Sequence, residues 1–575
     1  MDTESATTQL HALIAAEWES RLREDPLFAT YTGDHRFDNR LPDAGEDPAA
    51  RWLAHLRDVR AQLARLDGAL LSGADRQNLA ILGRLLDDEI AELEFHAYRL
   101  PISRSGGFHV QLVEDLPAIM PFDTVADYEA YLARLAAFPS FFSAQIGVMR
   151  GGLATGYRPS RVTLTGVDDA ARQQIVAEAS LSPLYAPLTR FPPAIGGADR
   201  ERLAAAGADA ILHAVVPAYQ SLLRFLLDEY LPAGSEEVGA SRLPDGRAFY
   251  QHRIHLYTSL QLTPEQVHNT GQAEVQRIRA EMQDLMDAAG FGGTLPEFVA
   301  SLRADARHYA ATPEALLRET AYVLKRIDGE LPGLFKTLPR TPYGIRPIPA
   351  ASAPGNTTAY YFPPTGDGRR AGFYYVNTYD LASRPLYEIE ALSLHEAVPG
   401  HHLQIALQQE LDLPPFRRFR FFTEFVEGWA LYAERLGLEM GFYQDPTSNF
   451  GRLSYEMWRA CRLVVDTGLH ALGWTRQQAI DFMAANTSST LLNIANEVDR
   501  YIAWPGQALA YKIGELKIRE LRARAEQRLG TRFDIREFHD LALGSGAVPL
   551  DLLERMVDAW LAAQPSSPNT GERMG

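Results

Sequence analysis

Three histidines and a glutamate lie within eight residues, in the segment HEAVPGHH at 395–402. The chain has 15 histidines among 575 residues, so this local density is far above its average. A histidine followed directly by a glutamate, with a second histidine one helical turn away, is a zinc-binding pattern. The two histidines bind the metal and the glutamate reaches a water beside it. The segment therefore predicts metal-assisted hydrolysis.

The spacing of these histidines departs from that pattern. Position i+4 from His395 is Pro399, whereas the next histidines stand at i+6 and i+7. On a straight helix, His401 would lie about 240° around the axis from His395, so the two could not share a metal. Pro399 and Gly400 are residue types that break or bulge helices. Two residues looped out would restore the one-turn relation, so we predict His395 and His401 as ligands, with His402 as the alternate.

A catalytic zinc usually has three protein ligands and one open position. A second helix is predicted after Pro414-Pro415, and it carries Glu424, Glu427 and Glu434. Its short connection to the histidine helix makes the two antiparallel neighbours. We predict Glu427 as the third ligand, because Gly428 beside it allows close backbone approach, and Glu424 is the alternative. Glu434, two turns on, is expected to hydrogen-bond a ligand histidine.

The elements that must position these residues are mostly helices. Leu, Ala, Arg and Glu dominate, and apolar residues recur every three or four positions. One region differs: 357–363 and 371–378 are aromatic and β-branched and predict a β-hairpin. The expected fold class is therefore mainly α, with a small hairpin or sheet beside the metal-binding helix. The strand at 373–378 offers an edge with which an extended peptide could pair, and Asn377 would then contact the peptide backbone. A turn residue is the favoured interpretation of Asn377.

The predicted domain organisation has two helical lobes. Residues 1–245 form an N-terminal lobe that ends at LPDGRAFY, and 246–564 form a catalytic lobe with the metal site. Residues 565–575 read PSSPNTGERMG and lack apolar content, so a disordered tail is expected there.

Composition narrows the function classes. The net charge of −17 repels phosphate backbones, so no nucleic-acid partner is expected. The single cysteine, Cys461, excludes an intramolecular disulfide and a thiolate metal site. The N-terminus has no basic segment before an apolar run, and no stretch reads as about 18 uncharged apolar residues. We therefore expect no membrane segment and a cytoplasmic location.

Four segments resemble the bacterial domain-of-unknown-function 885 family, and the resemblance covers nearly the whole chain: HEAVPGHHLQ, EGWALYAERLG, VVDTGLHALGW and RYIAWPGQALAYKIGELKI. That family is similar to helical zinc metallopeptidases that carry H-E-x-x-H and a downstream glutamate. The resemblance implies a zinc-peptidase-like fold, one Zn²⁺ per chain, and a tyrosine or histidine that stabilises the oxyanion. Tyr511, Tyr501 and His470 are the candidates for that role. The second histidine is displaced by two residues here, and a one-residue expansion occurs in the dipeptidyl-peptidase III family.

The expected function is a zinc-dependent hydrolase, most specifically a metallopeptidase acting on a peptide or small amide. His395, His401 and Glu427 would hold Zn²⁺. Glu396 would take a proton from the metal-bound water and deliver it to the leaving amine. Two alternatives stay open: a metal-dependent hydrolase of a non-peptide amide or ester, and a non-catalytic binding protein that retains the peptidase fold.

Overall fold

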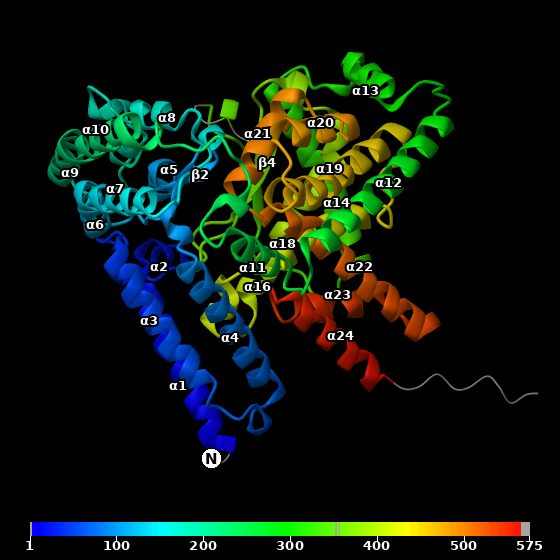
Figure 1. Ribbon diagram of the computed structural model, residues 1–575, viewed down its shortest axis with the longest axis horizontal. Coiled ribbons are helices and arrows are strands. Elements are labelled where there is room, and N and C mark those ends of the chain that lie inside the picture. The colour runs from blue at the N-terminus through cyan, green and yellow to red at the C-terminus, as the bar shows by residue number, and fades with distance from the viewer. Residues whose placement is uncertain (1–2, 351–352, 356, 565–575) are drawn as a thin grey trace, which may run out of the picture. The chain divides into compact units, whose positions relative to one another are not determined.

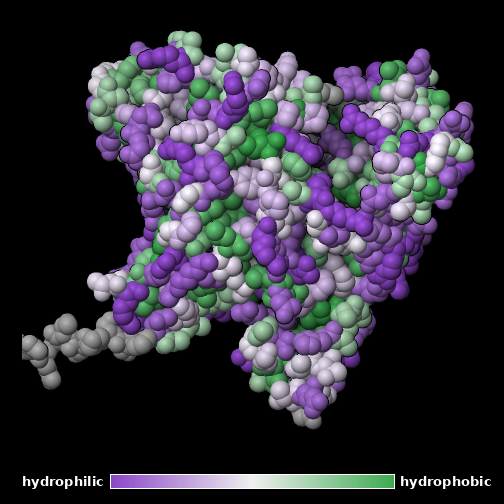
Figure 2. All heavy atoms as spheres, turned by 180° about the vertical axis from the view of Figure 1, so that it is seen from behind, coloured by the Kyte–Doolittle hydropathy of each residue, from purple (hydrophilic) through white to green (hydrophobic). Residues whose placement is uncertain are grey.

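The computed structural model describes residues 3–350, 353–355 and 357–564. The predicted disordered tail at 565–575 lies outside the described residues. Helices hold 70% of the residues and strands 4%, which confirms the mainly α fold class with small sheets. On the face shown in Figure 2, hydrophilic side chains predominate and hydrophobic ones lie between them in patches.

The chain forms two compact units. The first comprises Met1–His252, Thr365–Asp367 and Asn496–Trp504, and the second comprises Arg253–Pro364, Gly368–Ala495 and Pro505–Gly575. The sequence set one boundary near residue 245 and did not assign the two later segments to the first unit. Both segments are short, and their assignment depends on tertiary contacts that composition does not report.

The first unit is almost entirely helical. Long helices α1, α3 and α4 pack side by side (Figure 1), and α7 and α10 share an aromatic core in which Phe142 contacts Tyr219. Its elements are α1 Thr3–Glu24, α2 Pro26–Thr32, α3 Glu46–Leu63, α4 Gly73–Glu94, β1 Ile102–Ser103, β2 Gly106–Gly107, α5 Phe108–Ile119, α6 Val125–Ala136, α7 Phe138–Ala154, α8 Val167–Gln173, α9 Gly197–Ala210 and α10 Val216–Phe225.

Two stretches of this unit are long and apolar enough to cross a membrane by length and composition, although no membrane segment was expected from the sequence. They are Val125–Ala154 and Gly197–Tyr230. In each, 44% of the most apolar window is buried inside the protein. Their apolar side chains contribute to the hydrophobic core that holds Phe138, Phe142 and Tyr219. Part of their apolar surface is thus buried in this core.

The second unit contains the predicted metal-binding segment. Helix α19 is buried along most of its length and packs against α12, α20, α15 and α22, while α18 packs against α22 (Figure 1). The elements are α12 Pro264–Ala288, α13 Leu295–Ala304, α14 Pro313–Leu334, β3 Tyr343–Pro347, β4 Ala359–Phe362, β5 Gly372–Val376, α15 Ile389–Glu396, α16 His401–Glu410, α17 Pro415–Phe419, α18 Thr423–Leu436, α19 Pro446–His470, α20 Arg476–Asn486, α22 Ala510–Leu529, α23 Ile535–Leu543 and α24 Leu550–Ala563. Helices α11 Gly246–Thr258 and α21 Leu491–Ala503 run from one unit into the other.

The predicted hairpin is present as β4 and β5, and β4 contacts α15. A third strand, β3, pairs in parallel with β5, so β5 lies in the middle of the sheet. The prediction that 373–378 pairs with a peptide as an edge strand is therefore wrong, because both edges of β5 are already paired. Asn377 is fully buried; its amide donates to the carbonyls of Ala353 and Thr357. Its role is to hold the adjoining loop.

A buried ionic network joins three helices of this unit. Lys512 of α22 is fully buried, and its Nζ lies 2.8 Å from Glu456 of α19, 2.9 Å from Glu515 and 3.0 Å from Glu274 of α12. Burial alone would lower the pKa of Lys512, but these carboxylates outweigh burial and raise it. The ammonium therefore stays charged and holds the three helices together.

Replacing Lys512 by Met should reduce the free energy of unfolding by about 3–5 kcal/mol, because two buried carboxylates and the half-buried Glu274 lose a shared cation. Urea denaturation would measure the loss. Lys325→Met is the matched control, since the Lys325 side chain is 82% exposed and pairs with Asp328 at the surface. That control should change stability by less than about 0.5 kcal/mol. Equal stability of the two variants would contradict a structural role for the network.

Candidate metal centre

The helix that carries the histidines is interrupted between them. Helix α15 ends at Glu396 and α16 begins at His401. Between them, Ala397 and Gly400 leave helical geometry, with ψ angles of −102° and −129°. The Ala397 carbonyl accepts the backbone N–H of His402 at 2.9 Å, which starts the second helix. The Pro-Gly pair thus lies in a break that brings His401 next to His395.

Gly400 is required by this break. A Cβ atom at Gly400 would overlap the backbone carbonyl oxygens of His395 and Leu394, and those oxygens are fixed by α15. Trp429, which is fully buried in α18, donates its indole N–H to the Pro399 carbonyl at 2.8 Å and braces the same turn. The loop is therefore held from both sides.

A Gly400→Ala variant should lose about 2 kcal/mol of stability, since the added methyl group forces backbone to move. It should also bind zinc at least about tenfold more weakly, because His401 is the next residue. Gly329→Ala in α14 is the control: nothing lies within 4 Å of its Cβ position, so about 0.5–1 kcal/mol of stabilisation is expected. Thermal unfolding and a chelator competition measure both effects, and a wild-type zinc affinity in Gly400→Ala would contradict the requirement.

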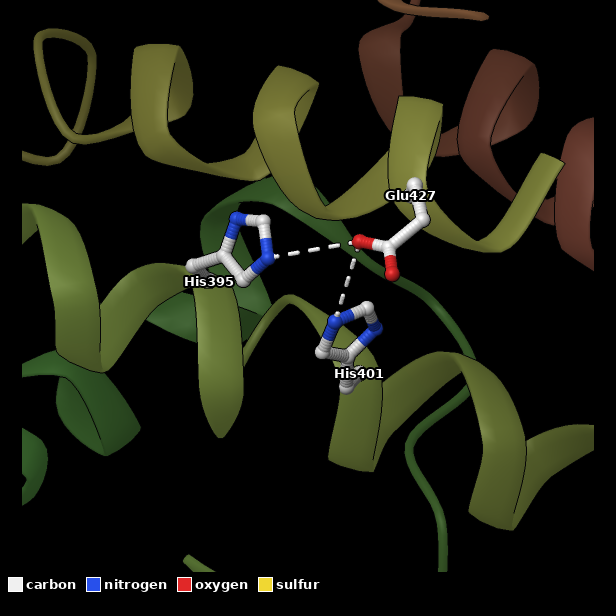
Figure 3. Close-up of side chains that lie close together, drawn as sticks. All are labelled: His395, His401 and Glu427. Carbon is white, nitrogen blue, oxygen red and sulfur yellow. Dashed lines mark ion pairs between the residues drawn. The ribbon is translucent and has the colours of Figure 1, made fainter. Parts of the chain in front are cut away.

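Three side chains converge at the break. His395 comes from the end of α15, His401 from the start of α16 and Glu427 from α18 (Figure 3). Glu427 Oε2 lies 3.6 Å from His395 Nε2 and 3.5 Å from His401 Nε2. One potential ligand atom from each residue lies within 4.8 Å of the others. The structure therefore brings together the three predicted ligands.

The spacing of these atoms fits a metal ion better than direct hydrogen bonds. Ligand atoms about 2.0–2.1 Å from a tetrahedral zinc lie about 3.3–3.4 Å apart, close to the two distances observed. Among the described residues, Glu427 Oε2 and His401 Nδ1 are buried without a hydrogen-bond partner. Such atoms are costly to bury unless something binds them. The donor set of two imidazoles and one carboxylate is one that zinc accepts.

The electrostatics of the cluster are strongly coupled. Burial alone would lower the pKa of His395, but its interactions with the carboxylates of Glu427 and Glu434 outweigh burial and raise the pKa to about 9. Burial alone would raise the pKa of Glu427, but interactions with His401 and His395 hold it well below its usual value. Without a metal, a proton on His395 therefore compensates the buried carboxylates.

The ring of His395 is oriented by a second carboxylate. His395 Nδ1 donates to Glu434 Oε1 at 2.8 Å, and Glu434 is 2% exposed. With Nδ1 held there, Nε2 is directed toward Glu427. This is the hydrogen bond predicted for Glu434, and metal-ligating histidines commonly have such a partner.

Gly428 allows close backbone approach, as expected from the sequence, and the neighbouring backbone is that of α22. Its Cβ would lie 2.5 Å from the Cα of Gly514 in α22, and a Cβ on Gly514 would overlap the carbonyl of Glu424. Helices α18 and α22 therefore touch through their backbones one residue after Glu427. This contact fixes the helix that carries the carboxylate.

His402, the alternate ligand, is engaged elsewhere. Its Nε2 donates to the Thr341 carbonyl at 3.1 Å, so its Nδ1 accepts the hydroxyl of Tyr361 at 2.8 Å. Burial lowers the pKa of His402 to about 4, which keeps the ring neutral. Both nitrogens thus serve the contact between α16 and the β-sheet region.

The other predicted residues lie in different settings. Glu396, the last residue of α15, is 8% exposed. Burial chiefly, and the nearby charge of Glu396 in addition, raise the pKa of Tyr374. Glu424, the alternative ligand, is buried but is not part of the cluster of three. The remaining predicted residues are Tyr511, Tyr501 and His470.

Two of the three candidates for oxyanion stabilisation, Tyr511 and Tyr501, contact residues outside the cluster. The Tyr511 ring lies 4.3 Å from the Arg462 guanidinium, and its hydroxyl accepts from Gln507 at 3.4 Å. Tyr501 belongs to the first unit and donates to Glu497 at 2.7 Å. His470 ends α19 and is 1% exposed.

One buried residue near the cluster was not predicted. Arg459 of α19 is 4% exposed and pairs with Glu434. The only signal in the sequence is an arginine among apolar residues in MWRACRLVV, which amphipathic helices also show. Its partner is 25 positions away in the chain, so only the packing of α19 on α18 identifies it.

Comparison with known proteins identifies one matching family and solved structures with a similar fold. The model of the family described as bacterial protein of unknown function (DUF885) matches residues 26–557. No curated protein matches the chain. The crystal structure of a candidate lipoprotein from Colwellia psychrerythraea is similar, with a TM-score of 0.92 and 29% identity over 97% of this chain and 100% of that one.

A second solved structure shares the fold at greater distance. It is described as a candidate lipoprotein of unknown function from Shewanella oneidensis, with a TM-score of 0.70 and 18% identity over 95% of this chain and 99% of that one. The family expected from the four sequence segments is confirmed by the match over most of the chain: this protein belongs to the DUF885 family of bacterial proteins of unknown function.

Proposed function

We propose that the protein is a zinc-dependent hydrolase, most specifically a metallopeptidase. The observation that carries the proposal is the convergence of His395, His401 and Glu427, with a buried Glu427 oxygen that lies near both imidazoles and makes no hydrogen bond among the described residues. Packing alone gives no reason to bury that oxygen between two imidazoles. The Glu427 side chain is 18% exposed and that of His401 is 11% exposed, so this side of the cluster reaches solvent. A small substrate group can approach there.

Each residue of the site has a separate proposed role in hydrolysis. Bound zinc would supply a Lewis acid that polarises a carbonyl and acidifies water. Glu396 directly follows a ligand histidine and is the base that accepts a proton from the attacking water and passes it to the leaving nitrogen. Tyr511, Tyr501 and His470 remain the candidates to stabilise the oxyanion. A protein that only binds a metal has no need of a carboxylate beside His395.

Metal analysis of the purified protein tests the proposal. Mass spectrometry should find about one zinc per chain, and the zinc-loaded protein should cleave members of a quenched peptide library. Small amides and esters added to the same panel separate a peptidase from a hydrolase of non-peptide substrates. A wild-type protein that takes up no metal, even after incubation with zinc, would rule out the proposed mechanism.

Zinc affinity should rise about tenfold per pH unit between pH 7 and pH 8.5. His395 must lose a proton before Nε2 can bind a metal, and its pKa is raised to about 9. Below that pH the proton competes with zinc, so a higher pH favours binding, and the gain levels off above pH 9. Calorimetry in buffers of different ionisation enthalpy measures the released proton. Glu434→Gln should move the plateau to lower pH, whereas a pH-independent affinity would contradict the assignment.

The description of a similar protein is also relevant to the cellular location of this chain. The similar Colwellia protein is described as a candidate lipoprotein, which indicates the cell envelope for that protein. This counts against the cytoplasmic location expected from the sequence, and we propose an envelope location for this chain. Fractionation of the native organism, with an antibody against the full chain, would distinguish the two compartments.

A further inference from the structure

The carboxylate that orients His395 is itself held by an arginine. Glu434 Oε1 lies 2.8 Å from His395 Nδ1 and 3.2 Å from Arg459 Nη2. Both Glu434 and Arg459 are almost fully buried. Two donors therefore converge on one oxygen, while Glu434 Oε2 has no hydrogen-bond partner among the described residues. His395 and Arg459 together therefore fix the position of Glu434 Oε1.

Arg459 is fixed independently of Glu434. Its guanidinium lies 4.6 Å from the Tyr455 ring and 5.2 Å from the Trp458 ring, and Nη1 donates to the Tyr455 carbonyl at 3.2 Å. These contacts come from the same helix, α19. A planar guanidinium stacked on aromatic rings keeps its direction and loses little entropy on binding a carboxylate.

Glu434 is also fixed through its backbone. The Tyr443 hydroxyl donates to the Glu434 carbonyl at 2.8 Å. The carboxylate is thus held from the backbone side by Tyr443 and from the side-chain end by Arg459. His395 is the third group of this arrangement and the one that faces the ligand cluster.

Arg459 places a positive charge against the buried carboxylate of Glu434. Glu434 and Glu427 lie on opposite sides of the His395 ring, facing Nδ1 and Nε2. Without Arg459, Glu434 Oε1 loses one of the two donors that hold it, so the carboxylate can turn away from His395. That turn removes the acceptor that keeps Nε2 directed at Glu427.

We propose that Arg459 is a positioning residue of the metal centre. It acts through Glu434 and sets the orientation of His395, and thereby the affinity of the site for zinc. The inference rests on the proposed function, since it concerns the same ligand. The orientation of the ring can nevertheless be measured without any metal.

A set of variants tests the route through Glu434. Zinc affinity is measured by chelator competition for the wild type, Arg459→Met, Glu434→Gln and the double variant. Each single variant should bind zinc about 10–100-fold more weakly. The double variant should lose no more than Glu434→Gln alone, because Arg459 has no further effect once its partner is changed. A loss equal to the product of the two single losses would overturn the proposal.

Arg462→Met is the matched control. Arg462 is also 4% exposed, lies one turn further along α19 and stacks on the same Trp458 ring at 4.6 Å. It should keep zinc affinity within about twofold of the wild type. Arg459→Lys keeps the charge without the planar stacking, so it should fall between the wild type and Arg459→Met. An equal loss in Arg459→Met and Arg462→Met would mean that any buried arginine of α19 matters, and the proposal would fail.

Folding and metal binding are separated by two further measurements. Arg459→Met leaves the buried negative charge of Glu434 without its arginine, whereas the double variant also removes that charge. The double variant can therefore be measured even if Arg459→Met does not fold. Metal-free crystal structures of Arg459→Met and Arg462→Met then show the His395 ring. Loss of the contact with Glu434 in the first alone supports the proposal, and an unchanged ring in Arg459→Met overturns it. A wild type without zinc affinity would contradict the proposed function, and these metal-free structures would still decide the role of Arg459.

Discussion

Glu396→Gln should retain zinc and lose at least about 100-fold in kcat, because general acid–base catalysis contributes about 10²–10⁴-fold. Glutamine has nearly the shape of glutamate and cannot accept the proton of the attacking water. Glu396 is absent from the cluster of three ligands, so the metal content should stay at the wild-type level. Zinc per chain and turnover of a peptide substrate are measured on the same preparation.

Glu390→Gln is the control for this variant. Glu390 lies on the same helix, α15, where its carboxylate accepts the Tyr443 backbone N–H at 2.9 Å. Glutamine retains an oxygen that can accept this bond, so activity should stay within about twofold. A Glu396→Gln enzyme with wild-type turnover would remove Glu396 from the mechanism and leave the metal site intact.

His401→Ala should bind zinc more than about 100-fold more weakly, since removal of a ligand costs more than the 10–100-fold typical of an outer partner. His402→Ala, one residue away, should keep zinc affinity. It should instead lose about 1–3 kcal/mol of stability, because Thr341 and Tyr361 lose their shared partner. The two variants each remove one histidine from the start of the same helix, α16, so they differ only in which histidine is lost.

The opposite outcome has a clear meaning. Zinc retained in His401→Ala and lost in His402→Ala would make His402 the ligand, and the hydrogen bonds to Thr341 and Tyr361 would have to break on metal binding. Zinc retained in both variants would place the metal elsewhere. Far-UV circular dichroism confirms that each variant is folded before its metal content is compared.

Much of the fold could be predicted because local patterns specify it. The three-and-four spacing of apolar residues predicts helices, and the aromatic segments around GDG predict the hairpin of β4 and β5. Strand β3 was missed because parallel pairing joins segments almost 30 residues apart and has no turn signature. The same parallel partner makes β5 a central strand, which excludes it as an edge for substrate.

The ligand set could be proposed from residue types, but the choice between neighbours could not. His401 and His402 differ only in the direction that the break at Ala397–Gly400 gives to each side chain. Glu424 and Glu427 lie on the same helix, and only the packing of α18 decides which one meets the histidines. Such choices depend on contacts between helices, for which a single sequence carries no periodic signal.

The sequence by itself determined the helical class, the position of the helix break, and the chemistry available in HEAVPGHH, because residue type and local spacing fix these properties. Tertiary structure decided that Glu427 lies between His395 and His401, and that Arg459 meets the carboxylate of Glu434 behind them. It also placed Tyr501 in the first unit with Glu497. The physical reason is the separation along the chain of the residues involved. A helix break and the types of ligand residue depend on neighbouring positions, whereas the partner of a buried charge depends on how helices distant in the sequence pack together.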